Sequence, residues 1–302
     1  MSRVARAGDR PRLGFLGIGL MGEAMVRRLL DRGWTVTAWN LEPERLGLVV
    51  PHGAVAAGSP AEVAAASDVV VSCVLHAEAV ENCFFGPQGA AGAGAACAGK
   101  LAIDCSTIPP EAARATAARL RAEAGMGFVD APVSGGPPAA REGTLTVMAG
   151  GGAADFAAAE PVLRDLGANV TRVGGVGAGQ AAKMLNQAIV CTGFVAMAEA
   201  LAMAEAAGLD AATVPAALAG GLADGALLRK IWPLMQRRAF DPPLGYARQL
   251  LKDMRAVEAF AGGLGLDLPV VRAAAERVDA YVARGHAMED SVSVIRLYRD
   301  DP

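Results

Sequence analysis

The chain has 302 residues, of which 31 are acidic and 28 basic, and its formal net charge is −3 at pH 7. This balance excludes a broad basic surface that would neutralise many phosphates, so we expect no nucleic-acid partner. The mean hydropathy of +0.33 is high. The longest helix-like uncharged run, 184–198, is nevertheless shorter than the roughly 20 apolar residues that a bilayer span requires, so we expect no membrane span.

The first half of the chain alternates short apolar runs with amphipathic stretches. Short apolar runs, several of them rich in Val and bounded by Gly, Pro or Asp, predict strands at 12–16, 35–39, 68–74, 100–105, 127–130, 144–149 and 169–173. Helical spacing predicts helices between most of them, at 20–31, 60–66, 77–84, 109–123 and 153–166. This alternation is typical of a mostly parallel sheet covered by helices on both faces.

The strand pattern stops near 174–179, and only helical patterns follow. A long helix is predicted at 180–207, with further helices at 211–219, 248–262 and 269–284. We therefore predict an α/β domain over 11–176 and an all-helical domain over 177–302, with the long helix joining them.

A glycine motif connects the first predicted strand to the first predicted helix. It reads G-x-G-x-x-G and consists of Gly17, Ile18, Gly19, Leu20, Met21 and Gly22. In a strand–turn–helix context the first glycine permits a tight turn, the second admits a pyrophosphate and the third lets helix and strand pack closely. The N-terminus of the helix adds N–H groups and partial positive charge. The motif predicts a Rossmann-type dinucleotide site.

The residues after the second predicted strand bear on which dinucleotide binds. Asn40 lies 18 residues after Gly22 and can hydrogen-bond a ribose hydroxyl. Glu42 disfavours the extra phosphate of NADP, whereas Arg45, one helical turn on, could reach it. The sequence leaves both NAD and NADP open and slightly favours NAD.

Dehydrogenation of an alcohol also needs a group that exchanges the hydroxyl proton. The three histidines, His52, His76 and His286, lie outside any motif. Only four of the basic residues are lysine, and a partly buried lysine can titrate toward neutrality and act as an acid or base. Lysine is therefore the alternative to histidine as the proton-exchanging group.

Lys183 opens the long helix in GAGQAAKMLNQ, and Asn186 and Gln187 follow it three and four residues later. This spacing places three polar groups on one face of an otherwise apolar helix. They would hydrogen-bond a small acid substrate, or Lys183 would simply bond loop carbonyls at the helix start. The residues alone do not decide between these interpretations.

Five motifs in order resemble the β-hydroxyacid dehydrogenase family, which is 6-phosphogluconate dehydrogenase-like, over nearly the whole chain. They are GFLGIGLMG, DCST at 104–107, DAPVSGG at 130–136 followed by GTLTVMAGG, GAGQAAKMLNQ, and LLKD at 250–253. The resemblance implies an oxidoreductase that moves a hydride between NAD or NADP and a small β-hydroxy acid or its semialdehyde, of the 3-hydroxyisobutyrate or tartronate semialdehyde type. Alternatives on the same scaffold are a glyoxylate or succinic semialdehyde reductase, an imine reductase, or a non-catalytic dinucleotide-binding assembly protein.

The resemblance also implies roles for individual residues. Lys183 matches the family's catalytic lysine, which exchanges a proton with the substrate oxygen. The substrate-binding set is implied to be Ser134, Gly135, Gly136, Asn186 and Gln187. The cofactor-binding set is implied to be the six residues of the glycine motif with Asn40, Val74, Leu75, Thr107 and Lys252. The chain departs from the family at Leu41, where members that use NADP often carry arginine, and at His76, where proline is usual.

Partners and location follow from composition. Five cysteines without a C-x-x-C pair make a disulfide framework or zinc site improbable and favour a reducing compartment. The polar segment 1–12 lacks the apolar stretch of a signal peptide, so we expect a cytoplasmic protein. The apolar helices of the second domain exceed what one small domain buries, which predicts a homodimer or homotetramer formed through that domain.

Overall fold

The computed structural model describes residues 10–299, so most of the N-terminal segment 1–12 lies outside the described residues. The chain divides into two compact units after Lys183. The first unit contains a nine-stranded sheet in the order β3-β2-β1-β4-β5-β6-β8-β7, with β9 paired to β8. The strands are β1 Leu13–Leu16, β2 Val36–Trp39, β3 Val55–Ala56, β4 Val69–Ser72, β5 Leu101–Asp104, β6 Gly127–Asp130, β7 Val133–Ser134, β8 Leu145–Gly151 and β9 Gly167–Gly174. The run from β3 to β6 is parallel and has the strand order of the dinucleotide-binding fold.

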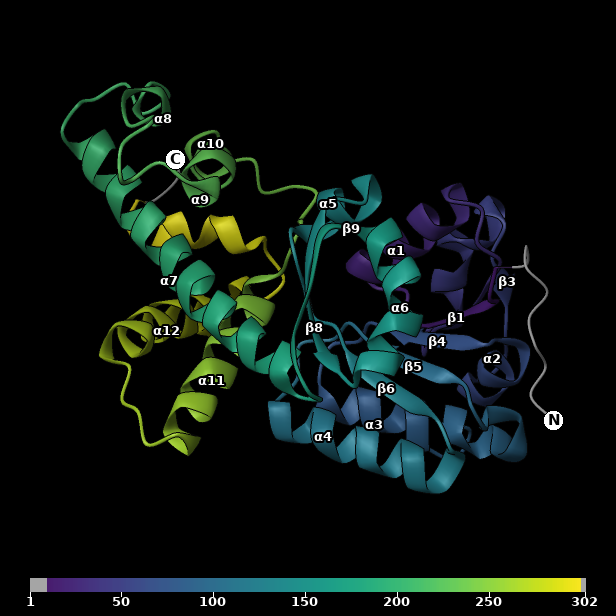
Figure 1. The fold of residues 1–302 in the computed structure, drawn as a ribbon. Coiled ribbons are helices and arrows are strands. Elements are labelled where there is room, and N and C mark those ends of the chain that lie inside the picture. The colour runs from purple at the N-terminus through teal and green to yellow at the C-terminus, as the bar shows by residue number, and fades with distance from the viewer. Residues whose placement is uncertain (1–9, 300–302) are drawn as a thin grey trace. The chain divides into compact units, whose positions relative to one another are not determined.

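Helices cover both faces of the sheet because its central strands are apolar on both sides. In β1, Leu13 and Phe15 face one apolar cluster, whereas Leu16 faces the other. Figure 1 shows α1 and α6 on one side of the strands and α3 and α4 on the other. The helices of this unit are α1 Leu20–Asp31, α2 Pro60–Ala66, α3 Ala77–Phe85, α4 Pro110–Arg119, α5 Gly136–Glu142 and α6 Ala153–Leu166, with short helical turns η1 Pro43–Leu48, η2 Val50–His52, η3 Ala90–Cys97 and η4 Leu120–Ala124. The predicted α/β Rossmann-type domain is confirmed.

The register of the parallel strands brings their carboxyl ends to one edge. Ser72 pairs with Asp104 and Asp104 with Asp130, so β4, β5 and β6 end level with one another. Leu16 at the end of β1 pairs with Ser72. The loops that follow these strands carry the predicted cofactor and substrate residues, and this edge positions them together.

The shortest strands of the sheet and the helical turn η3 were not predicted. β3 and β7 have only two residues each, too few for an alternating pattern to register, and η3 lies in a glycine- and alanine-rich run without helical periodicity. β7 pairs antiparallel with β8, which also pairs antiparallel with β6. The hairpin-like edge thus places Ser134 beside the parallel part of the sheet.

The second unit is helical, as predicted. Its elements are α7 Ala178–Ala206, which begins in the first unit, α8 Val214–Ala217, α9 Ala226–Lys230, α10 Trp232–Gln236, α11 Ala247–Gly263, α12 Pro269–Tyr281, η5 Val282–His286 and η6 Ser291–Leu297. The predicted helix at 211–219 is wrong in extent, since only Val214–Ala217 is helical. Ala211, which was predicted to be helical, lies in the loop before α8. Its carbonyl accepts a hydrogen bond from the Trp232 indole N–H at 2.8 Å, and this bond holds the loop in place.

The division between the units falls inside α7, between Lys183 and Met184, whereas the change of sequence pattern lies at 176–177. The first turn of α7 bonds Asp130 of the sheet, so it packs with the first unit although it belongs to the helix. Periodicity marks where the helix starts and carries no information about which unit its first turn contacts.

Helix α7 is long and apolar enough to cross a bilayer by length and composition alone. A third of its most apolar window is buried in the structure, and Cys191, Val195, Ala198 and Leu201 belong to the core of the helical unit. A core helix passes the same compositional test, so one such helix is weak support for a span. That the chain does not enter a membrane stays a prediction.

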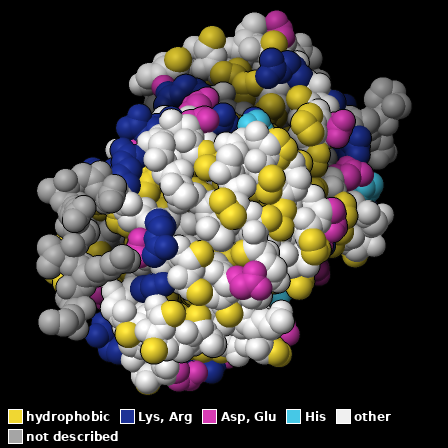
Figure 2. Space-filling view, turned by 90° about the vertical axis from the view of Figure 1, so that its right-hand side faces the viewer, with side chains coloured by type: hydrophobic (Ala, Val, Ile, Leu, Met, Phe, Trp, Pro, Cys, Tyr) yellow, Lys and Arg dark blue, Asp and Glu magenta, His cyan; other side chains and the backbone are white. Residues whose placement is uncertain are grey.

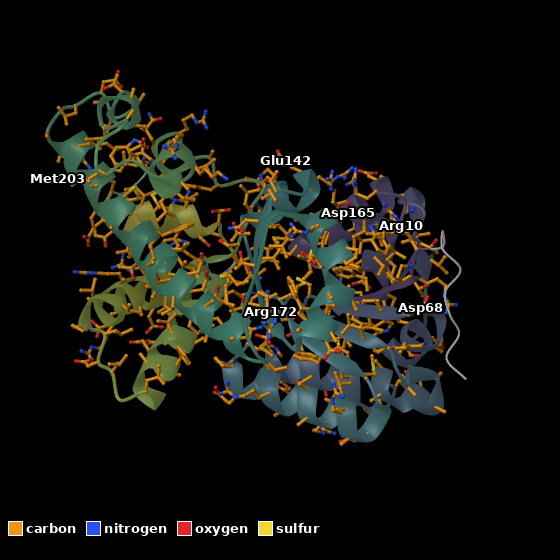
Figure 3. All side chains as sticks on the ribbon, in the orientation of Figure 1. Arg10, Asp68, Glu142, Asp165, Arg172 and Met203 are labelled. Atoms are coloured by element: carbon orange, nitrogen blue, oxygen red, sulfur yellow. The ribbon has the colours of Figure 1, made fainter. Side chains whose placement is uncertain are left out.

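Charged side chains are mixed over the surface. On the face shown in Figure 2, basic side chains are scattered among acidic and apolar ones. Several arginines of the sheet domain are held locally: Arg12 bonds Asp68 at 2.9 Å and Arg32 bonds Asp165 at 2.8 Å, both aspartates being labelled in Figure 3. These pairs leave the domain's positive charge locally compensated.

Candidate active site

The glycine loop has the geometry that its sequence predicts. Gly17 adopts φ +99°, and a Cβ there would lie 2.5 Å from the Cys73 carbonyl oxygen. A Cβ on Gly22 would lie 1.9 Å from the Gly17 carbonyl oxygen, so only glycine lets α1 pack on β1. A Cβ on Gly19 would meet nothing within 4 Å, and no side chain caps α1. The open space at Gly19 and the bare N-terminus of a 12-residue helix fit a pyrophosphate.

Asn40 organises this loop from the end of β2. Its side chain is buried, its Oδ1 accepts a hydrogen bond from the Ile18 N–H at 2.6 Å, and its Nδ2 donates to the Glu42 carboxylate at 2.8 Å. Arg45 donates from Nε to the Ile18 carbonyl. Sequence reasoning assigned Asn40 to the ribose. The structure adds that its amide fixes the loop and leaves the Glu42 carboxylate as the acidic group at this strand end.

The loops after β4 and β5 are tied to each other and to α7. The Val74 N–H donates to Ser106 Oγ at 2.9 Å, and Ser106 Oγ donates to buried Asp104 at 2.6 Å. The Gln180 amide donates to the Ser106 carbonyl at 2.7 Å and accepts from the Ile108 N–H at 3.2 Å. Thr107 therefore lies between Ser106 and Ile108, whose backbone groups both hydrogen-bond the Gln180 side chain. Leu75, next to Val74, is partly exposed.

Two of the three histidines have structural partners. His76 caps α3 by accepting from the Ala79 N–H through Nδ1 at 3.1 Å. His286 Nδ1 lies 2.7 Å from Glu289 and its ring stacks on Tyr281 in the helical unit. His52 lies in η2 on the surface. These positions favour lysine over histidine as the proton-exchanging group.

The predicted substrate loop follows β7 and has a conformation that glycine favours. Ser134 is half-buried at the end of β7, Gly135 has φ +137° and Gly136 has φ +76°. A Cβ on Gly135 would approach the Ala139 Cβ to 2.7 Å. A hydroxyl followed by two successive N–H groups in such a turn is a plausible cradle for an anion.

Lys183 is buried and its ammonium group bonds this loop. The side chain is 6% exposed, and Nζ donates to the Val133 carbonyl at 2.8 Å. This is the carbonyl bond that a purely structural lysine would also make, but the acceptor is the residue immediately before Ser134. The structure thus brings Lys183 and the predicted anion cradle together.

A second set of predicted residues forms a chain within the helical unit. The Asn186 amide donates to Gln187 at 2.7 Å, and Gln187 in turn donates to Asp253. Lys252 Nζ lies 3.0 Å from the other oxygen of Asp253. Asp253 was not among the predicted site residues. It is the residue that joins α7 to α11 through polar contacts, and the polar pair on α7 was the available signal.

Two buried carboxylates at the sheet edge were also missed as site residues. Burial raises the pKa of Asp104, and burial with the neighbouring Asp104 raises the pKa of Asp130 to about 6. Their positions at the start of DCST and the start of DAPVSGG were visible in the sequence, but their burial was not. No His, Cys, Asp and Glu cluster suited to a metal occurs among residues 10–299.

Comparison with known proteins places this site in a family. A model of the NAD binding domain of 6-phosphogluconate dehydrogenase matches residues 12–175, and a model for the NAD-binding domain of NADP-dependent 3-hydroxyisobutyrate dehydrogenase matches 177–298. The chain belongs to the β-hydroxyacid dehydrogenase family. It is an NAD(P)-dependent hydroxyacid dehydrogenase, as the five motifs predict.

Its relatives share the family's activities by name. The chain is 35% identical to 2-hydroxy-3-oxopropionate reductase of Escherichia coli over 94% of its own length and 96% of the relative's. It is 41% identical to 3-hydroxyisobutyrate dehydrogenase of Pseudomonas aeruginosa over 67% of each chain. The solved 3-hydroxyisobutyrate dehydrogenase of Salmonella typhimurium matches with a TM-score of 0.85 at 29% identity, covering 95% of this chain and 99% of that one.

Proposed function

We propose that the protein interconverts a small β-hydroxy acid and its semialdehyde, of the 3-hydroxyisobutyrate or tartronate semialdehyde type, with Lys183 as general acid and base. The observation that carries the proposal is the buried Lys183 ammonium, 2.8 Å from the carbonyl that precedes Ser134. A bound nicotinamide supplies the hydride or accepts it. Lys183 would donate a proton to the carbonyl oxygen during reduction and remove it from the hydroxyl during oxidation.

The residues around Lys183 support a substrate with a carboxylate. Ser134 and the N–H groups of Gly135 and Gly136 would hold the carboxylate, and Asn186 and Gln187 would bond the substrate's remaining polar groups. Holding acid, carbonyl and lysine together makes proton and hydride transfer effectively intramolecular. The relative named 2-hydroxy-3-oxopropionate reductase, which acts on tartronate semialdehyde, supports this substrate class.

Substitution of Lys183 tests the acid–base role. We expect Lys183→Ala to lose about a thousandfold or more in kcat, within the range of general acid–base catalysis, while NADH binding measured by fluorescence stays within a few fold. Lys183→Arg keeps the charge but does not titrate near neutrality, so it should also be inactive. Turnover of either variant within a few fold of the parent would contradict the role.

A substrate panel tests the specificity. We expect the highest kcat/KM with 3-hydroxyisobutyrate or tartronate semialdehyde when the panel also contains succinic semialdehyde, glyoxylate and an imine. Solved imine reductases share the fold with TM-scores of 0.61 and 0.64 at 20% identity, which says nothing about the reaction. Preference for the imine would overturn the proposed substrate class.

We propose that NAD(H) is the preferred cofactor. Glu42 holds a carboxylate at the end of β2 through the Asn40 amide, and Leu41 is 75% exposed where a phosphate-binding arginine would otherwise project. A carboxylate at this place repels a 2′-phosphate. A smaller Kd for NADPH than for NADH, with Arg45→Ala removing the difference, would show that Arg45 reads the phosphate instead.

We also propose a homodimer or homotetramer in the cytoplasm, formed through the helical unit. Leu185, Ile189 and Met203 lie along one side of α7 and are 66%, 71% and 70% exposed; Figure 3 labels Met203. An exposed apolar stripe of this kind is typical of a subunit contact. Light scattering coupled to size exclusion should give a dimer or tetramer, and a monomer would refute the proposal.

A further inference from the structure

We propose that Asp130 is a positioning residue for catalysis: its buried carboxylate holds the first turn of α7, and thereby Lys183, against the substrate loop. The inference rests on the proposed role of Lys183. It concerns a residue outside the predicted cofactor-binding and substrate-binding sets.

The carboxylate contacts the helix at two points. Oδ1 accepts a hydrogen bond from the Gly177 N–H at 2.7 Å, and Oδ2 accepts from the Gln180 N–H at 2.9 Å. Amides in the first turn of a helix have no partner within the helix, and a negative charge there also interacts favourably with the helix dipole. One side chain on β6 therefore satisfies the amide just before α7 and one amide in its first turn with charge-assisted bonds.

Two glycines make this contact possible. A Cβ on Gly179 would lie 2.4 Å from the Met148 carbonyl and 2.9 Å from Asp130 Oδ2, and a Cβ on Gly150 would lie 2.6 Å from Asp130 Oδ1. The α7 backbone thus packs directly on the sheet, with no side chain between them. Close packing of this kind leaves the helix start little freedom to shift.

The same short segment contacts α7 twice. Asp130 bonds the amides of Gly177 and Gln180, and three residues later the Val133 carbonyl accepts from Lys183 Nζ. Lys183 follows Gln180 by one turn of the helix. Displacement of the first turn would therefore move the ammonium relative to Ser134, and a shift near 1 Å at a reacting group costs about a hundredfold in rate.

The carboxylate must be ionised to accept both bonds, so its role depends on pH. Burial raises the pKa of Asp130 to about 6. The charged groups on the surrounding elements are Asp104 on β5, Arg114 on α4 beside Gly177, Arg172 on β9 bonded to the Gly151 carbonyl and labelled in Figure 3, and Lys183 on α7. Protonation near pH 6 would weaken both contacts at once.

The test compares Asp130→Asn with the parent protein across pH. An asparagine accepts at only one of the two positions, so kcat at pH 7.5 should fall about 30- to 100-fold while the Kd for NADH changes less than threefold. The parent should lose kcat as pH falls through about 6, and the variant should lack this ionisation. A variant that keeps both the parent's kcat and its acid limb overturns the proposal.

Asp290→Asn is the matched control. Asp290 is a buried carboxylate that accepts backbone N–H bonds from Leu244 and Val292 in the helical unit. Its loss should lower Tm without changing the shape of the pH profile. An acid limb that disappears equally in both variants would show a general effect of instability and would overturn the proposal.

A measurement on the parent protein keeps the proposal testable if Asp130→Asn does not fold. The kcat of the parent should fall as pH decreases through about 6 while its Kd for NADH stays within threefold, and a kcat that is unchanged between pH 7.5 and pH 5 overturns the proposal. Failure of the Lys183 role is separate: an active Lys183→Ala protein would refute the proposed function whatever Asp130→Asn does.

Discussion

Gly19→Ala should separate cofactor binding from folding. Gly19 has φ −80° and ψ −168°, which alanine adopts readily, and its Cβ would meet no protein atom within 4 Å. The substitution should therefore change the free energy of unfolding by less than about 1 kcal/mol. The new methyl group would instead occupy the space that the pyrophosphate needs above the start of α1.

The expected loss of affinity follows from the bonds that the phosphate would forfeit. Keeping the phosphate away from the helix start weakens one or two charge-assisted hydrogen bonds, at about 1.5 kcal/mol each. A total near 2 to 3 kcal/mol corresponds to a Kd for NADH about 30- to 150-fold higher. Fluorescence titration measures the Kd and differential scanning fluorimetry measures Tm.

Gly92→Ala is a suitable control, because its Cβ also meets nothing within 4 Å and it lies in η3, outside the glycine loop. Both variants should melt close to the parent, and only Gly19→Ala should bind NADH weakly. If a folded Gly19→Ala protein bound NADH within threefold of the parent, the cofactor would not approach the backbone at Gly19 and this interpretation of the loop would be refuted.

Three further changes test other parts of the structure. Gly22→Ala should destabilise the protein by about 2 to 3 kcal/mol and lower Tm by several degrees, because its Cβ would lie 1.9 Å from the Gly17 carbonyl; an unchanged Tm would refute the packing of α1. Glu42→Gln should tighten NADPH binding about five- to tenfold relative to NADH, and an unchanged ratio of the two Kd values would show that this carboxylate does not face the ribose. Asp130 should make the free energy of unfolding depend on pH. Its pKa is raised to about 6 in the folded state, so ionisation of its carboxyl group favours unfolding. The stabilisation that comes from the protonated carboxyl is therefore fully present below about pH 4 and is lost as pH rises through about 6. Urea unfolding at pH 4.5 and 7.5 should show the parent losing about 2 kcal/mol relative to Asp130→Asn, and parallel behaviour of the two proteins would contradict the raised pKa.

Local patterns were sufficient for the longer strands of the sheet, the glycine loop and the position of Lys183 at the start of a helix. Each of these depends on residues that are near in sequence, such as the Val-rich run of β4 or the G-x-G-x-x-G spacing before α1. The resemblance added the substrate-binding role of Ser134.

The contacts that complete the site join residues far apart in the chain. Gln180 bonds Ser106 and Ile108 across more than 70 positions, and Asp130 bonds Gly177 across 47. No periodicity reports such a pairing, and burial of a carboxylate becomes evident only when the strands are in register. The two-residue strand β7 is invisible for a similar reason, since it forms only against β8.

The close packing of Asp130 with Gly150 and Gly179 has a consequence for how this enzyme can diversify. A larger residue at either glycine would collide with the carboxylate, and a shorter residue at 130 would leave two amides of α7 without an acceptor. The three positions should therefore covary in homologous sequences or remain unchanged together. Laboratory evolution toward new substrates should therefore reject single changes at the three packed positions.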